Sequence, residues 1–347
     1  MLTLGFARRF ATYKRPNLLL TDPDRLIRIL TDARRPVQIL LAGKAHPADQ
    51  AGKNLIREWT QFVKRPEVLG RAIFFSDYDM LLTEHMVQGV DVWINTPRRP
   101  WEACGTSGMK VLVNGGINLS ELDGWWAEAY TLDVGWALGD GQEHGDDPGL
   151  DAKDANALYE LLETRVVPEF YTRNNRGIPV AWVNRMRQSM ARLTPRFSAE
   201  RAVREYTEQI YLPAAASVRS RIADKGEVGA RIVEWTKDIE RNWADLRFGE
   251  TKVETRDGHH LFEVQVRLGA LDPSAVRLEL YAEALDGGVP VHHALDGIRS
   301  LPGTTGLYAY SASVSDLRPS ADYAARMVPH FPGVAVPLEI RQILWSR

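Results

Sequence analysis

Four basic residues lie close to the amino terminus: Arg8, Arg9, Lys14 and Arg15. No Asp or Glu occurs among the first twenty residues. Arginine can hold a phosphate group with two parallel hydrogen bonds, and lysine supplies a point charge. Cations near the start of a helix are unfavourable unless an anion is present, because the free N–H groups there already carry positive charge. The cluster therefore predicts a site for one or two phosphate groups, and a solvated basic face remains the alternative.

A second cluster lies in the stretch "PWEACGTSGMKVLVNG", residues 100–115. A predicted helix opens there with Gly105, Thr106, Ser107 and Gly108, and Lys110 follows. Glycines let the backbone approach a ligand, and free N–H groups at a helix start can hold an anion. A lysine that is partly desolvated and flanked by cations would have a lowered pKa, which favours reaction with an aldehyde cofactor. A capped helix whose lysine extends into solvent is the alternative, and the spacing excludes a P-loop.

The surrounding pattern shows which elements must position these clusters. Short apolar runs, interpreted as buried strands, cover residues 2–6, 36–43, 71–77 and 90–97. Helical patterns lie between them at 47–64 and 79–89. Continuous apolar strands separated by helices indicate a parallel sheet that is covered on both faces. Both clusters follow predicted strands, and ligands of such sheets bind at the loops beyond the carboxyl ends of the strands.

The second half of the chain has a different pattern. Residues 151–248 are predicted to be helical, with a Ser198 N-cap on a helix over 198–212 and a long amphipathic helix over 226–248. After residue 249 the period shortens to two, as in "LFEVQVRL" (261–268) and "VRLELYAEAL" (276–285). "GLYAYSASV" and "PLEIRQILW" extend this pattern. The sequence therefore predicts a small antiparallel β domain at this end.

Composition limits the class of protein. The chain has 347 residues and 44% hydrophobic content, which suits two domains. A formal net charge of −2 gives no reason to expect a nucleic acid or an anionic membrane as partner. Cys104 is the one cysteine, and the opening "MLTLGFARRF" lacks the apolar run of a secretory signal. We expect a soluble, cytoplasmic protein without a membrane span or a metal site.

Five motifs occur in order along the first part of the chain: "RRFATYKR", "LLAGKAHPAD", "FFSDYDM", "EACGTSGMK" and "NGGINLSELDG". In this the chain resembles the C-terminal half of the α-glucan (glycogen or starch) phosphorylases. "GTSGMK" and "DGWWAEAY" resemble the bacterial branch in particular. The resemblance covers roughly residues 1–215, and the β region resembles the tail of some bacterial members more weakly.

The resemblance implies an α/β fold: a Rossmann-like doubly wound parallel sheet, the second lobe of a two-lobed GT-B glycosyltransferase, followed by helices and a small antiparallel β domain. We expect this lobe over residues 1–215, a helical connector over 216–248 and a β-sandwich-like domain over 249–347. The implied enzyme uses pyridoxal 5'-phosphate, cleaves terminal α-1,4 bonds of a glucan with inorganic phosphate and releases glucose 1-phosphate.

The resemblance also implies which residues bind the cofactor. Lys110 matches the family's imine-forming lysine, which tethers the cofactor. Arg8 matches a family lysine near the cofactor phosphate, with the charge kept and the geometry changed. Tyr78 corresponds to a residue near the cofactor ring. Thr106 and Ser107 correspond to backbone contacts at the cofactor phosphate.

Substrate contacts follow from the same motifs. Arg9 matches the arginine that binds substrate phosphate, and Lys14 matches the lysine between the two phosphates, so these two are the expected catalytic residues. Tyr13 falls on the tyrosine beside that lysine. Glu102 and Gly105 align with residues that hold the sugar hydroxyls. Two unit charges about 4 Å apart repel by ~4 kcal/mol at an effective dielectric of 20, and the cations would offset this repulsion.

Some positions depart from the family pattern. Cys104 stands where a serine usually lies near a sugar hydroxyl, and a thiol is a weak hydrogen-bond partner. Asp79 replaces an arginine. The family's first lobe, which supplies a histidine and loops to the sugar site, has no counterpart in this sequence. We therefore expect a fragment, a truncated reading frame or half of a split enzyme, nearly inactive without that lobe, because a cleft with one wall cannot exclude water. A homodimer remains open.

Two other functions remain as alternatives. A sugar-nucleotide glycosyltransferase of the same fold often has a second glutamate eight residues after the first. Here Lys110 stands eight residues after Glu102, which disfavours a nucleotide. A non-catalytic glucan-binding protein could stack Trp125 and Trp126 on sugar, although buried packing is the commoner role of such side chains.

Overall fold

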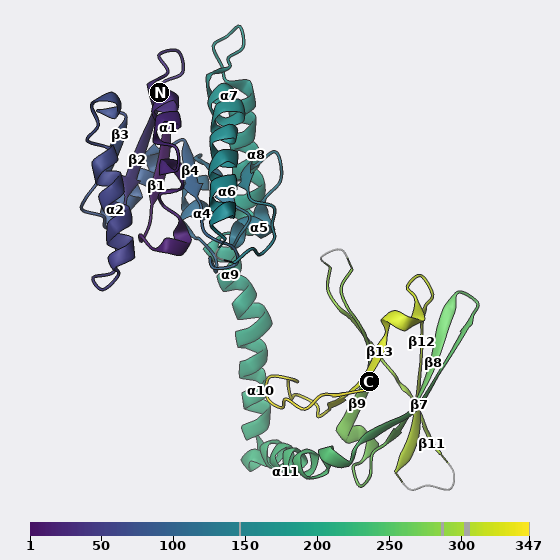
Figure 1. Cartoon of the computed structure of the whole chain (residues 1–347). Helices are drawn as coiled ribbons and strands as arrows, with labels where there is room; N and C mark the ends of the chain where they lie inside the picture. Colours follow the sequence, from purple (N-terminus) through teal and green to yellow (C-terminus); the bar gives the residue numbers. More distant parts are fainter. Residues whose placement is uncertain (146, 286–287, 302–305, 347) are drawn as a thin grey trace. The chain divides into compact units, whose positions relative to one another are not determined.

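The chain divides into two compact units, Met1–Arg204 and Glu205–Arg347 (Figure 1). The computed structural model describes residues 1–145, 147–285, 288–301 and 306–346. Each unit has its own hydrophobic core, and the two are described separately below.

The first unit is built on a six-stranded sheet in the order β3-β2-β1-β4-β5-β6. All neighbouring strands run parallel. The strands are β1 (Leu2–Ala7), β2 (Val37–Ala42), β3 (Ala72–Phe75), β4 (Val92–Asn95), β5 (Ile117–Glu121) and β6 (Gly135–Leu138). In the register, Leu4 lies opposite Ile39 on one side and Val92 on the other. This order is the Rossmann-like arrangement, in which the direction of winding reverses between β1 and β4.

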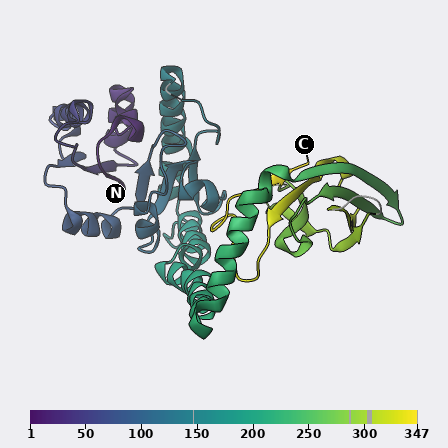
Figure 2. The ribbon, with the colours of Figure 1, turned by 90° about the horizontal axis from the view of Figure 1, so that it is seen from below.

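Helices cover both faces of this sheet (Figure 1 and Figure 2). The helices of this unit are α1 (Pro23–Thr31), α2 (Gln50–Phe62), α3 (Met80–Gly89), α4 (Ser107–Leu112), α5 (Trp125–Ala129), α6 (Pro148–Leu161), α7 (Val167–Tyr171) and α8 (Val180–Arg196). The next helix, α9 (Ala199–Tyr206), has no buried residue and includes the boundary between the two units. Short 3₁₀ or π turns complete the unit: η1 (Thr12–Lys14), η2 (Leu18–Leu20), η3 (Pro66–Val68) and η4 (Leu162–Val166).

The side chains of β1 point alternately to the two faces of the sheet, so this one strand packs against both helical layers. Leu2, Leu4 and Phe6 belong to the core shared with α1, α2 and α6. On the opposite face, Ala7 packs with residues of α3 and α4. Gly5 lies on that side too, where a Cβ would come within 2.8 Å of Val90. The small residues of β1 therefore let the second helical layer approach closely.

The second unit begins with helices and ends in two antiparallel sheets. The helical segments are η5 (Thr207–Tyr211), α10 (Leu212–Ile222), η6 (Asp224–Gly226), α11 (Glu227–Asn242) and η7 (Trp243–Asp245). One sheet has the order β11-β12-β8-β7 and the other β10-β9-β13-β14. Their strands are β7 (Arg247–Arg256), β8 (His259–Arg267), β9 (Val276–Ala282), β10 (Val291–Ala294), β11 (Gly297–Ser300), β12 (Leu307–Ser315), β13 (Ala324–Pro329) and β14 (Leu344–Trp345), with turns η8 (Pro273–Ala275) and η9 (Ser320–Asp322).

One core lies among these strands and α11. Phe262, Val264 and Val266 of β8 are buried in it with Leu278 of β9. The alternation predicted for 261–268 is therefore confirmed, and so is the fold class: a Rossmann-like parallel sheet followed by helices and a small antiparallel β domain.

Three predicted elements need correction. The helix expected over 226–248 ends at Asn242, and β7 already includes Arg247 and Phe248. The helix expected over 198–212 has its Ser198 cap, with a bond of 3.1 Å from Arg201 N–H, but it continues through a π turn into α10. The strand expected over 337–345 is limited to Leu344–Trp345.

The shortening of this last strand has a local cause. The Glu339 carboxylate accepts a hydrogen bond from the Ala335 N–H at 2.9 Å, and the Glu339 N–H donates to the Ala335 carbonyl at 2.8 Å. These bonds close a turn over the residues that were expected to be extended. Pro337 also has no N–H to give to a neighbouring strand.

Candidate functional site

The candidate site lies where β1 and β4 end. These strands are neighbours in the sheet, and the order of the strands reverses between them. Residues 8–15 follow β1, and residues 96–107 follow β4. Parallel sheets bind ligands outside the carboxyl ends of the strands at such a reversal. The two clusters that the sequence singles out therefore flank the place where this topology favours a ligand.

Glu102 connects the two clusters. One carboxylate oxygen, Oε2, accepts a hydrogen bond from Arg8 Nη2 at 2.9 Å and another from Lys14 Nζ at 2.6 Å. The Glu102 side chain is 14% exposed, and both cations are buried. Its backbone N–H donates to an Asp123 carboxylate oxygen at 2.8 Å, which fixes the loop after β4 to the loop after β5. Three of the predicted site residues thus meet at one carboxylate.

Arg8 has unused hydrogen-bonding capacity. Its Nε and Nη1 atoms are buried and have no hydrogen-bond partner among the described residues. Burial lowers the pKa of this guanidinium, and the nearby Glu102, Tyr13 and Tyr78 oppose that effect. A buried guanidinium with two unpaired nitrogens is costly unless a further acceptor is supplied. Arg8 therefore has the donors to hold an anion.

Tyr13 and Tyr78 lie near Lys14 and Arg8. The Lys14 ammonium lies 4.8 Å from the centre of the Tyr13 ring, and Trp101 packs against that ring with centroids 6.1 Å apart. Tyr78 packs partly buried against the core of α3 and α4, close enough to Arg8 to influence its pKa. Arg9 is exposed.

The start of α4 differs from the expectation in one respect. Lys110 is exposed, and its Nζ lies 3.4 Å from the Thr106 hydroxyl. The sequence-based expectation of partial desolvation is therefore wrong, because Val111 and Leu112 form the buried face of this helix and Lys110 falls outside it. Gly105 has a positive φ of 81°, a conformation that favours glycine.

Other α4 contacts are more local. The Ser107 hydroxyl accepts a hydrogen bond from the Trp93 indole N–H at 3.1 Å. Cys104 is partly buried, and burial together with Glu128 and Glu102 raises the pKa of its thiol. The thiol form is therefore favoured, which argues against a reactive cysteine. Asp79 caps α3 by accepting the Leu82 N–H at 2.8 Å.

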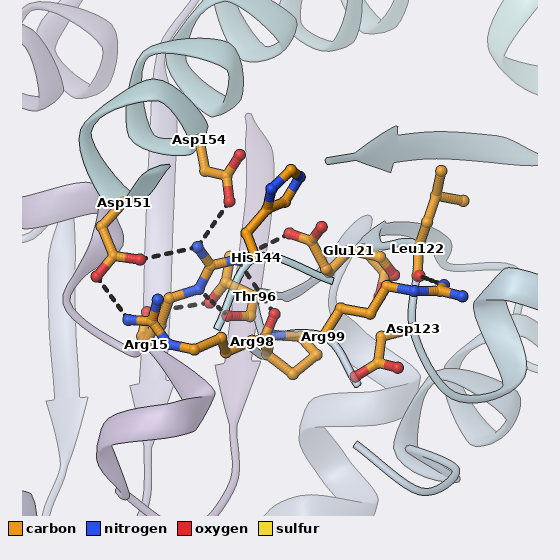
Figure 3. A network of polar contacts seen from close by, with 12 residues as sticks. Arg15, Thr96, Arg98, Arg99, Glu121, Leu122, Asp123, His144, Asp151 and Asp154 are labelled. Atoms are coloured by element: carbon orange, nitrogen blue, oxygen red, sulfur yellow. Dashed lines mark hydrogen bonds and ion pairs between the residues drawn. The ribbon is translucent and has the colours of Figure 1, made fainter. Parts of the chain in front are cut away.

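Arg15 has a role that the sequence did not reveal (Figure 3). The sequence groups Arg15 with the phosphate-binding cations, but its guanidinium is buried and bonded to three carboxylates of the first unit: Glu121 at 2.8 Å, Asp154 at 2.7 Å and Asp151 at 3.0 Å. With its donors engaged inside the protein, Arg15 has none to offer a phosphate. These carboxylates are far away in sequence, so no local pattern points to them.

Glu121 is the most perturbed member of this network. Burial raises the pKa of its carboxyl to about 8, and the attraction of Arg15 only partly offsets the effect. Since the folded state favours the neutral form, folding takes up a proton between pH ~5 and the raised pKa, and stability falls as pH rises through that window.

A pH-dependent stability follows from this. Glu121→Gln keeps the shape of the neutral acid and cannot ionise. We expect its unfolding free energy to decline less steeply than that of the unmodified chain between pH 5 and 8, so that the variant gains relative stability at the upper end. Urea unfolding followed by tryptophan fluorescence at several pH values measures this. Parallel curves for the two proteins would contradict the assignment.

The described residues also bear on membrane crossing, metal binding and the stacking of tryptophan on sugar. No helix in the described ranges combines the length and the apolar character that crossing a bilayer requires. Within the same ranges, no group of three or more His, Cys, Asp or Glu side chains is placed to hold a metal ion. Trp125 and Trp126 are both buried in the first unit, and the Trp126 indole N–H donates to the Trp136 carbonyl at 3.1 Å. Neither ring is available to stack on a sugar.

Comparison with known proteins gives a consistent family. The family model described as carbohydrate phosphorylase matches residues 7–132. A glycogen phosphorylase of Mycobacterium tuberculosis is 38% identical over 98% of this chain and 40% of its own length. A maltodextrin phosphorylase of Thermococcus litoralis is 39% identical over 99% of this chain and 41% of its own length. A glycogen phosphorylase of Aquifex aeolicus is 50% identical over 61% of this chain and 30% of its own length.

The chain thus spans about 40% of the length of the relatives that it matches over almost its whole sequence. The matched family segment includes both clusters of the candidate site, residues 8–15 and 100–115. The chain therefore matches the carbohydrate phosphorylases over this segment, which confirms the resemblance that its motifs predicted.

Proposed function

We propose that this chain supplies the cofactor- and phosphate-binding part of a pyridoxal-phosphate-dependent α-glucan phosphorylase. The reaction would be the phosphorolysis of terminal α-1,4 bonds, with release of glucose 1-phosphate. The observation that carries the proposal is the buried Arg8, with two unpartnered nitrogens, beside Lys14 in a segment that matches the phosphorylase family. The two cations share the Glu102 carboxylate, and Arg8 keeps two donors for a further anion.

The residues present fit pyridoxal phosphate in two respects. The amine of Lys110 is exposed and accessible to an aldehyde, and Arg8 has free donors for a phosphate group. Lys110 would hold the cofactor covalently, while Arg8 and the backbone at Thr106 and Ser107 would hold its phosphate. When bound, the cofactor supplies a phosphate group that exchanges a proton with substrate phosphate.

The remaining roles belong to the residues around this group. Lys14 would keep its ammonium between the two phosphates and reduce their repulsion, which is ~4 kcal/mol for unit charges about 4 Å apart. Arg9, which is exposed, would bind the substrate phosphate from the open side. Glu102 and Gly105 would hold the sugar hydroxyls, with Cys104 and Tyr13 beside them. Tyr78 would pack near the cofactor ring.

The wider setting is also a proposal. We place the Rossmann-like lobe in residues 1–215, a connector in 216–248 and a β-sandwich-like domain in 249–347. We also propose a cytoplasmic location, because a chain with one cysteine cannot form an internal disulfide and suits a reducing compartment. The partners would be an α-1,4-glucan, inorganic phosphate and a first lobe, since the relatives are more than twice as long as the matched part. Oligomeric state is open, a homodimer included.

A second function, binding of glucan without catalysis, has less support. Trp125 and Trp126, which could stack on sugar in that case, are buried. A sugar-nucleotide transferase is disfavoured by Lys110 at the position where that class has a glutamate.

Complementation tests the proposed function. The chain alone, loaded with pyridoxal phosphate, is expected to release no glucose 1-phosphate from maltodextrin and phosphate, because one lobe cannot close the cleft. Addition of the separately produced preceding part of the maltodextrin phosphorylase relative is expected to restore release. A chain that transfers glucose from a sugar nucleotide instead, or a mixture that stays inactive although the two parts associate, would contradict the proposal.

A further inference from the structure

Arg15 joins four parts of the first unit at one guanidinium (Figure 3). Its Nε donates to the Thr96 carbonyl at 3.0 Å and its Nη2 to the Pro97 carbonyl at 3.1 Å, both in the loop after β4. The remaining bonds go to Glu121 at the end of β5 and to Asp151 and Asp154 of α6. Arginine alone has enough donors, in a fixed planar arrangement, to satisfy five acceptors together.

The backbone of Arg15 is held in an unusual state. Its φ is 43°, a left-handed conformation that is costly for a residue with a Cβ. The residue follows η1 directly, and its N–H donates to the Thr12 carbonyl at 3.0 Å. The bonds of the side chain hold this conformation, which ends the turn and sets the direction of the chain at Lys14.

A second set of contacts fixes Lys14 itself. The Thr96 hydroxyl lies 3.1 Å from the Lys14 carbonyl and 3.0 Å from the Arg15 carbonyl, as a donor to both. The Arg98 N–H donates to the Tyr13 carbonyl at 2.6 Å, and the Arg98 side chain reaches Asp151 at 2.8 Å. The turn that carries Lys14 is thereby tied to the same loop and the same helix as Arg15.

We propose that Arg15 is a positioning residue for the anion site: its buried ion network holds the turn over 12–14 so that Lys14 Nζ meets Glu102 Oε2. Arg15 touches no ligand and acts through Lys14. The consequence for phosphate rests on the proposed function, whereas the placement of Lys14 does not. Glu121, Asp151 and Asp154 serve to anchor Arg15.

Chemical acetylation of the folded chain, followed residue by residue by mass spectrometry, measures the placement of Lys14. Lys14 is buried and ion-paired, so acetic anhydride should modify it slowly. Arg15→Lys keeps the charge and loses the five-acceptor geometry. We expect the acetylation rate of Lys14 to rise about ten-fold in this variant, since a small displacement opens a buried contact. The exposed Lys53 of the same chain serves as internal reference.

Arg25→Lys is the matched control. Arg25 also connects the amino-terminal part to the α6 region, through Glu163 at 2.6 and 2.9 Å and Asn156 at 2.7 Å, but it leads to no residue of the site. Its replacement should leave Lys14 protected. Equal protection of Lys14 in Arg15→Lys and the unmodified chain would overturn the proposal, and so would equal exposure in the two variants.

Two additions make the test decisive. If Arg15→Lys does not fold, Thr96→Val, which removes the hydroxyl facing the Lys14 carbonyl, takes its place with the same expected direction. Titration with inorganic phosphate separates the two proposals. We expect the Kd to rise about ten-fold in Arg15→Lys. If the unmodified chain binds no phosphate, the proposed function is wrong. The acetylation rates of Lys14 would still test the role of Arg15 in that case.

Discussion

Lys110→Ala is expected to abolish the borohydride-stable label that pyridoxal phosphate leaves on this chain. Lys110 is exposed at the start of α4, so its amine can meet an aldehyde without any rearrangement. Reduction with borohydride makes the attachment permanent, and peptide mass spectrometry then locates it. We expect one dominant labelled peptide, the one that contains residues 102–110, and its loss in the variant.

Surface lysines also react with aldehydes, so the selectivity of the label is what matters. Lys53→Ala removes another exposed lysine and should leave the label unchanged. Pyridoxal, which has no phosphate, should label Lys110 less than pyridoxal phosphate does, because Arg8 supplies free donors for the phosphate. Arg8→Met should reduce the difference between the two labels. A label spread evenly over the lysines, or one that survives Lys110→Ala, would refute the cofactor assignment.

The sequence predicted β1 through β4, whose residues are mainly apolar, and it missed β5 and the short β6. β1 through β4 appear as runs of mainly apolar residues, which is typical of strands covered on both faces. β5 carries Asn118, Ser120 and Glu121, all buried. Their burial depends on partners elsewhere in the fold, such as Arg15 for Glu121, so no periodicity marks this strand.

The sequence indicates which loops lie together at the candidate site, but it does not indicate which of their cations are engaged inside the protein. Loops after neighbouring parallel strands come together, so the two clusters of the sequence are expected in one region, and Arg8, Lys14 and Glu102 do meet there. The sequence alone does not show which of the four cations is available to a ligand and which is paired inside the protein. In the sequence, nothing distinguishes Arg15 from the other three cations of this cluster. Arg15 is buried because it pairs with Glu121, Asp151 and Asp154, which lie far away along the chain.

Glu102→Gln is expected to tighten the binding of inorganic phosphate. Glu102 accepts from Arg8 Nη2 and Lys14 Nζ, the donors that the proposed phosphate groups would use. The carboxylate therefore acts as an internal counter-ion that a phosphate must displace. Glutamine keeps the shape and loses the charge, so both cations become available. We expect the Kd for inorganic phosphate, measured by calorimetry, to fall about ten-fold.

The same substitution should change stability in a linked way. Without phosphate, Arg8 and Lys14 lose their shared counter-ion while they remain buried, which should lower the unfolding free energy by about 1–3 kcal/mol. Saturating phosphate should restore most of that loss, because a ligand that binds only the folded state stabilises it. The unmodified chain should gain less from phosphate at the same concentration.

Glu169→Gln provides the matched control. Glu169 forms a two-bond ion pair with Arg185, at 2.9 and 3.0 Å, and its side chain is 15% exposed, against 14% for Glu102. Its replacement should cost stability to a similar degree and leave the phosphate Kd unchanged, since Arg185 contacts no residue of the candidate site. Weaker phosphate binding by Glu102→Gln would contradict this prediction. It would mean that the Glu102 carboxylate positions Arg8 and Lys14 for the phosphate and does not compete with it. Equal effects of phosphate on the two variants would mean that the anion binds somewhere else.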